Sequence, residues 1–137
     1  MVFAEEDPVY SAKCLKYSKA LYDFAETYKT TYTGQIPDAG TFYNSWSGYN
    51  DELAWGAIWL YRATGDDVYL TKAKNINLAD SNEFSWDNKN EAARILLAQI
   101  TGEQTYKDGA EKFCNKVFSG AKTPDGYYKI CTQHILF

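Results

Sequence analysis

The stretch from Phe42 to Glu52 carries the residue types and spacing that most favour chemistry. It reads Phe-Tyr-Asn-Ser-Trp-Ser-Gly-Tyr-Asn-Asp-Glu and is rich in aromatic side chains. A sugar ring stacks its C–H face on a flat aromatic ring, because this buries apolar surface at a fixed geometry. Tyr43 and Trp46 are therefore candidates for binding a saccharide. The alternative is that both rings only plug the open end of a helical hairpin.

Two adjacent acids close this stretch and favour a site for a hard cation. Calcium takes about six to eight oxygen ligands from carboxylates, carbonyls and hydroxyls. Asp51 and Glu52 would supply carboxylates, Ser47 a hydroxyl and Gly48 a carbonyl, while Asp87 would add a carboxylate from the start of the next inner helix. The alternative is that acids in the first turn of a helix only interact favourably with the helix dipole.

The acids of the chain do not form a convincing catalytic pair. Hydrolysis of a glycoside needs two carboxyl groups placed across the scissile bond, and most of the 18 Asp and Glu residues fit solvated helix faces. His134 is the only histidine, and no partner motif accompanies it. The G-x-S-x-G, H-E-x-x-H and phosphate-binding glycine motifs are missing from the sequence. The residues therefore give no catalytic assignment.

Hydrophobic periodicity predicts helices that place these residues at helix starts and in the loops before them. Between Val9 and about Tyr28, apolar side chains recur at steps of three and four, which is typical of one face of an amphipathic helix. The segment after Asn50 is apolar almost all round, so it is expected to be a buried inner helix. That inner helix is expected to run from Asp51 to Ala63, with Asn50 as N-cap and Gly65 as stop. Three more helices are expected from Asp66 or Asp67 to about Ala79, from Ser85 or Asp87 to Gly102, and from Gln104 to about Phe118. Gly34, Pro37 and Gly40 predict an irregular loop before Asn50, and residues 121–137 are expected to be irregular or weakly extended.

A shift of 37 residues superposes two parts of the chain. Ile58, Leu60, Thr64, Gly65, Tyr69 and Ala73 then coincide with Ile95, Leu97, Thr101, Gly102, Tyr106 and Ala110. Each copy reads as an inner helix, a Thr-Gly turn and an outer helix, and the glycine supplies a left-handed residue at the turn. Because one hairpin cannot bury its own apolar face, the copies must stack. The predicted fold class is all-α, built of stacked αα-hairpins. The same shift places Asn50 on Asp87, which predicts that both helix starts face one rim.

Composition narrows the class of protein further. The 137 residues make about one domain, and 14 Lys and Arg against 18 Asp and Glu give a net charge of −4. This charge argues against nucleic acid and anionic membranes as partners. No apolar run approaches the ~20 residues of a membrane-spanning helix, and residues 1–8 do not resemble a signal peptide. Cys14, Cys114 and Cys131 fit neither a zinc motif nor a disulfide framework, and the first two are expected in the core.

Several segments carry a resemblance to a known enzyme family. They are Asp7-Pro8-Val9-Tyr10-Ser11 with Cys14-Leu15, Leu21-Tyr22-Asp23-Phe24-Ala25, the run from Phe42 to Leu53, Trp55-Gly56-Ala57, the run from Trp59 to Gly65, Phe84-Ser85-Trp86-Asp87 and Leu96-Leu97-Ala98. Together they closely resemble glycoside hydrolase family 9, and best its animal and plant-type endo-β-1,4-glucanases. The resemblance runs from residue 2 to about residue 126, and the Ser-Gly-Tyr-x-Asp-Glu-Leu run with its flanks is specific.

The resemblance implies an (α/α)6 toroid, inverting hydrolysis of β-1,4-glucan, an extracellular setting and a monomeric full-length enzyme. It implies that Tyr43 and Trp46 line the glucan cleft. It also implies that a calcium site pins the loops beside that cleft, with ligands from Ser47, Gly48, Asp51, Glu52 and Asp87.

The resemblance also places both catalytic carboxylates outside this chain. The base of the family comes from an Asp-Ala-Gly-Asp motif, and the run from Asp38 to Thr41 ends in threonine and lies at the wrong place. The family pattern fades around residues 123–126. Residues 1–137 are therefore expected to be an interior part of the catalytic domain, with five of the toroid's twelve helices and no activity alone. The alternative is a non-catalytic helical-repeat module that binds a saccharide or a protein.

Overall fold

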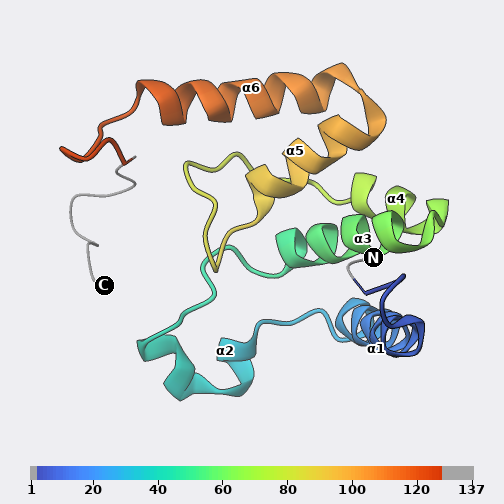
Figure 1. Cartoon of the computed structure of the whole chain (residues 1–137). Helices are drawn as coiled ribbons and strands as arrows, with labels where there is room; N and C mark the ends of the chain where they lie inside the picture. Colours follow the sequence, from blue (N-terminus) through green and yellow to red (C-terminus); the bar gives the residue numbers. More distant parts are fainter. Residues whose placement is uncertain (1–2, 128–137) are drawn as a thin grey trace. The chain divides into compact units, whose positions relative to one another are not determined.

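The computed structural model describes residues 3–127, which form helices and loops without a β-strand in that range (Figure 1). The chain divides into two compact units, the first ending at Asn77 and the second beginning at Leu78. The elements are α1 (Pro8–Thr27), α2 (Tyr32–Gln35), the 3-10 helix η1 (Pro37–Thr41), α3 (Asn50–Thr64) and α4 (Asp67–Lys74) in the first unit, and α5 (Asn90–Thr101) and α6 (Gln104–Ser119) in the second. The all-α prediction is confirmed for these residues. None of the described helices has the length and apolarity needed to cross a membrane.

A capping aspartate and a proline fix the start of α1. The Asp7 side chain accepts a hydrogen bond from the backbone N–H of Tyr10 at 2.9 Å. Pro8 occupies the first helical position, where its missing N–H would have no intrahelical partner in any case. The local sequence therefore determines where this helix begins, within one residue of the predicted boundary.

The turn between α3 and α4 follows from the Thr-Gly pair that ends α3. Gly65 has a positive φ of 70°, a conformation that costs a residue with a Cβ about 1–2 kcal/mol. The Thr64 hydroxyl donates to the Leu60 carbonyl at 2.7 Å and accepts from the backbone N–H of Asp66 at 3.1 Å. The Asp66 carboxylate then accepts from the N–H of Val68 at 3.0 Å and caps α4. Helix stop, turn and helix start are thus encoded in consecutive residues.

The turn between α5 and α6 repeats this geometry in the second unit. Gly102 has a φ of 67°. The Thr101 hydroxyl donates to the Leu97 carbonyl at 2.8 Å and accepts from the N–H of Glu103 at 3.1 Å. The same two hydrogen bonds therefore occur at both copies, which confirms that the 37-residue shift marks a structural repeat. Both copies pair an inner and an outer helix, since α3 packs on α4 and α5 packs on α6.

The predicted boundaries between the two hairpins are wrong. Helix α4 ends at Lys74 rather than near Ala79, and α5 begins at Asn90 rather than at Ser85 or Asp87. The backbone N–H of Ala79 donates to the Asn90 side chain at 3.0 Å instead of continuing a helix. The Ser85 hydroxyl accepts from the N–H of Asn88 at 3.2 Å and closes a turn. Side chains from α5 thus satisfy backbone groups that periodicity assigned to helices.

Three smaller expectations also need correction. Asn50 lies inside α3, and the N-cap is Tyr49 without a side-chain capping bond. Helices α2 and η1 interrupt the segment expected to be irregular. Cys14 is exposed on α1 and Cys114 is only half-buried on α6, because the helix faces that carry them are incompletely covered by the described residues.

Residues 121–127 contain an irregular turn, in which the N–H of Gly126 donates to the carbonyl of Thr123 at 2.9 Å, as expected. Cys131 and His134 lie outside the described residues.

Helix α3 supplies most of the buried core of the first unit, as its apolar sequence predicts. Its buried apolar residues are Leu53, Ala54, Ala57, Ile58 and Leu60. Tyr22 of α1 packs against this helix at Gly56, where an added Cβ would lie 3.2 Å from the tyrosine ring. The Tyr22 ring also meets Tyr69 of α4 edge-on, with centroids 5.9 Å apart. Tyr22 therefore joins α1 to both helices of the hairpin.

Burial gives Tyr22 an unusual titration, which provides a first testable prediction. Desolvation raises the pKa of Tyr22 to about 12, and the nearby Glu26 carboxylate adds to this effect. The folded state holds the phenolic proton more tightly than the unfolded chain, so the stabilisation is present below pH 10 and is lost as the pH rises toward 12. We expect the free energy of unfolding to fall across that interval more steeply in the wild type than in Tyr22→Phe, as measured by urea unfolding. Equal slopes would contradict the assignment to Tyr22.

Candidate functional site

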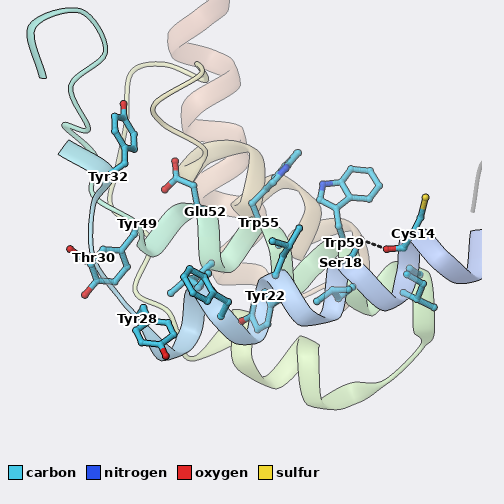
Figure 2. Close-up of a pocket in the computed structure, with 18 of the residues that line it drawn as sticks. Cys14, Ser18, Tyr22, Tyr28, Thr30, Tyr32, Tyr49, Glu52, Trp55 and Trp59 are labelled. Atoms are coloured by element: carbon cyan, nitrogen blue, oxygen red, sulfur yellow. Dashed lines mark hydrogen bonds between the residues drawn. The ribbon is translucent and has the colours of Figure 1, made fainter. Parts of the chain in front are cut away.

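A large groove of about 1370 Å³ opens in the first unit between α1, α3 and the residues that follow α1 (Figure 2). Mostly apolar and aromatic side chains line it, among them Leu15, Leu21, Phe24, Tyr28, Trp55 and Trp59. The apolar stripe predicted for the first helix faces this groove and not a core, since Leu21 and Phe24 are exposed. The buried side chain of α1 is Tyr22, which lies off that stripe.

Two tryptophans form one wall of the groove. Trp55 and Trp59 lie one turn apart on α3, with ring centroids 5.6 Å apart and planes at 73°. Figure 2 shows both rings rising from the same side of α3 as Glu52. The Arg62 guanidinium lies 5.0 Å from the centre of the Trp59 ring, a distance at which a cation is attracted to the ring face. The i, i+4 spacing predicts that the two rings meet. The apolar sequence of this helix, in contrast, predicted that all of its faces are buried.

The two residues predicted to stack on a sugar are exposed in the loop between η1 and α3. The Tyr43 residue is 65% exposed and Trp46 is 69% exposed. The Tyr32 hydroxyl of α2 donates a hydrogen bond to the Tyr43 carbonyl, so α2 holds the loop by its backbone. This exposure leaves ring surface that a ligand can contact, and it disfavours the alternative that both rings only fill the end of a hairpin.

Asp51 is a fully buried carboxylate at the start of α3. Its exposed fraction is 0%, and burial of a charge is unfavourable unless polar partners compensate it. The Ser47 hydroxyl lies 3.3 Å from Oδ1 and 3.4 Å from Oδ2 of Asp51, within hydrogen-bonding distance. The Ser45 hydroxyl donates to the Gly48 carbonyl at 2.9 Å, and Gly48 has a φ of 85°. The turn between Ser45 and Gly48 therefore places one hydroxyl, that of Ser47, beside the buried Asp51 carboxylate.

The remaining predicted metal ligands are arranged differently from the prediction. Glu52 is exposed and lines the groove, because successive side chains on a helix point about 100° apart. Asp87 belongs to the second unit and is 9% exposed. It lies inside the Ser85–Asn88 turn, three residues before α5, so the prediction that it sits at a helix start equivalent to Asn50 is wrong.

The oxygen donors near Asp51 suit a hard cation better than a soft one. Within residues 3–127, no three His, Cys, Asp or Glu side chains gather closely enough to hold a metal by themselves. Calcium also uses hydroxyl oxygens, and the Ser47 hydroxyl lies beside the Asp51 carboxylate. The buried Asp51 carboxylate and the Ser47 hydroxyl beside it thus have the chemistry of two calcium ligands.

Residues 1–135 match the family model of glycosyl hydrolase family 9. The chain belongs to this family. Endoglucanase B of Cellulomonas fimi is 42% identical to it over 124 residues, which cover 82% of this chain and 12% of that protein. The chain therefore spans less than a fifth of the length of this relative.

Solved structures show the same fold. The endoglucanase from the termite Nasutitermes takasagoensis matches with a TM-score of 0.84 and 38% identity, covering 91% of this chain and 30% of that one. Endoglucanase CelQ from Clostridium thermocellum, solved in complex with cellotetraose, matches with a TM-score of 0.60 and 34% identity over 82% of this chain and 19% of that one. The two hairpins of this family 9 chain are thus part of an (α/α)6 toroid.

Two features of this family 9 chain differ from what its sequence pattern predicts. One is the open groove, since periodicity finds an apolar face without saying whether anything covers it. The other is a buried ion pair between Glu91 and Arg94, whose Oε2 and Nη1 atoms lie 2.7 Å apart. The signal for this pair was opposite charges three residues apart within an otherwise apolar helix.

Proposed function

We propose that this chain forms part of the catalytic domain of an inverting endo-β-1,4-glucanase that hydrolyses internal bonds of cellulose. The observation that carries the proposal is the family 9 match over residues 1–135. Two exposed aromatic rings, Tyr43 and Trp46, on a loop held by α2 support it, because a glucan chain offers flat C–H faces for stacking.

In this proposal the described residues bind and orient the glucan and do not carry out the chemistry. An inverting glycosidase needs a carboxylic acid that protonates the leaving oxygen and a carboxylate that activates water on the opposite face. We assign neither role to an acid of this chain. Stacking on Tyr43 and Trp46 would instead hold sugar rings in register, so that a scissile bond lies at a fixed place.

We further propose that calcium binds beside this loop through Asp51, Ser47 and Gly48. The buried Asp51 carboxylate and the Ser47 hydroxyl against it support this site. When bound, the ion would offset the cost of burying the Asp51 charge and link the loop to the first turn of α3. Glu52 and Asp87 remain proposed ligands from the family resemblance.

The groove between α1 and α3 fits a chain that works as part of a larger domain. The relatives named above extend well beyond the part matched here. We propose that a further helix of a complete family 9 domain covers the apolar side chains of the groove, including Leu21, Phe24 and Trp59. We also propose an extracellular location, since cellulose is a polymer too large to enter a cell, and a monomeric complete enzyme.

Two measurements on the purified, helical chain test the proposal. We expect no reducing sugar above the buffer blank from carboxymethyl cellulose, because no acid here is assigned a catalytic role. We expect heat of binding with cellotetraose in calorimetry, because the aromatic rings are accessible. Hydrolysis would require a catalytic pair within this chain. Absence of cellotetraose binding would remove the support for a glucan-contacting loop and favour a helical-repeat module that binds a protein.

A further inference from the structure

The loop before α5 in the second unit is fastened at both ends by side chains of one helix turn. At its first end, Arg94 Nη2 donates to the carbonyl oxygens of Leu78 at 2.9 Å and Ala79 at 3.3 Å. The carboxylate of Glu91 accepts from the backbone N–H of Ser81 at 2.7 Å. At its far end, the Asn90 side-chain amide donates to the Asn88 side chain at 3.1 Å.

Glu91 and Arg94 form an ion pair with each other. Arg94 Nη1 donates to both carboxylate oxygens of Glu91, at 2.7 Å each. The two residues are 2% and 8% exposed, so water competes little for these charged groups. Hydrogen bonds between charged groups in such surroundings are short and strong, and the planar guanidinium fixes their direction.

A glycine on the neighbouring helix makes room for this pair. An added Cβ at Gly109 of α6 would lie 2.2 Å from Cδ and 2.9 Å from Nε of Arg94. Glycine inside a helix is less favourable than alanine by about 0.5–1 kcal/mol, so the position is not explained by helix stability. Gly109 is explained by the space that the Arg94 side chain needs.

We infer that Glu91 and Arg94 are positioning residues that hold the segment 78–88, and with it Asp87, in one conformation. Asp87 lies in the turn closed by the Ser85–Asn88 hydrogen bonds, between the two fastened ends. The segment has no regular secondary structure, so side-chain contacts with α5 replace the helical bonds that it lacks. The link to calcium through Asp87 rests on the proposed function, whereas the fixing of the segment does not.

Hydrogen exchange with peptide-level mass spectrometry tests the inference. We expect Arg94→Met to speed exchange in peptides from residues 78–88 by about 10–100-fold, because charge-assisted bonds to that backbone are lost. Peptides from α3 and α4 should keep wild-type rates. The matched control is Lys112→Met, which removes an exposed ion-pair partner of Asp80 and should leave the exchange rates of residues 78–88 unchanged. Unchanged exchange in Arg94→Met, or equal acceleration in every peptide, would overturn the inference.

Gly109 provides a second, independent measurement. Gly109→Ala should speed exchange of the same segment in the wild type, because the new methyl displaces Arg94. In an Arg94→Ala background, the same substitution should have no effect or should slow exchange, since the space is free and alanine favours the helix. An equal effect in both backgrounds would contradict the contact. If Arg94→Met does not fold, Glu91→Gln keeps the shape of the side chain and should give the same local change.

The effect of calcium on the melting temperature tests the proposed calcium site separately from this inference. If Asp87 is a ligand, Arg94→Met should also reduce the rise in melting temperature that calcium gives the wild type. A wild-type chain without such a rise would count against the proposed calcium site. The exchange experiment would still decide whether Arg94 positions the segment.

Discussion

Replacing Trp46 with alanine is expected to weaken cellotetraose binding by about 10–100-fold. Trp46 is 69% exposed, so its ring can bury apolar surface against a sugar without first leaving a core. Aromatic stacking of this kind contributes on the order of 1–3 kcal/mol when the surface burial of a tryptophan is included. Calorimetric titration of the variant against the wild type measures the change.

Phe42→Ala is the matched control for this measurement. Phe42 is another exposed aromatic residue of the same segment, but nothing in the sequence pattern assigns it to the cleft. We expect its affinity for cellotetraose to stay within about twofold of wild type. Both variants should keep the helical circular dichroism of the parent, since neither ring belongs to the buried core. Equal losses in the two variants would indicate nonspecific adsorption, and no loss in Trp46→Ala would end its assignment to glucan.

Replacing Asp51 with alanine is expected to abolish stabilisation by calcium. A ligand that binds only the folded state raises stability, by about 2.7 kcal/mol at a hundred times its dissociation constant. We therefore expect millimolar calcium to raise the melting temperature of the wild type but not that of Asp51→Ala, measured by thermal unfolding. Ser47→Ala should reduce the rise, because it removes the hydroxyl that lies against the carboxylate.

Two further variants control for a failure to fold and for an effect of the helix dipole. Asp51→Asn keeps the shape of the buried side chain, so it remains informative if the alanine variant does not fold. Asp67→Ala removes an exposed acid from the first turn of α4 and reports what a helix dipole alone contributes. A calcium response of wild-type size in Asp51→Asn would contradict the site, because a neutral amide carbonyl binds calcium more weakly than a carboxylate does. A lost response in Asp87→Asn would support Asp87 as a further ligand.

The sequence alone predicted the hairpins correctly because their signals are local. The Thr-Gly pairs at residues 64–65 and 101–102 stop one helix and turn the chain within a few consecutive residues. The glycine ends the helix because it adopts a left-handed conformation. The threonine hydroxyl donates to a carbonyl of the preceding helix and accepts from a backbone N–H after the turn, so no distant residue is needed. The exposed loop aromatics could be found in the same way, from residue type and place between helices.

Only the tertiary structure decided where the segment between α4 and α5 leaves the helical pattern. Periodicity assigned the two ends of this segment to helices, but Asn90, Glu91 and Arg94 form hydrogen bonds with its backbone instead. Tertiary structure also separated the two adjacent acids, because Asp51 faces the interior while Glu52 faces the groove. Sequence spacing thus determines which residues share a helix and how each helix ends. Burial depends on what packs against each face, and that information lies in residues far along the chain.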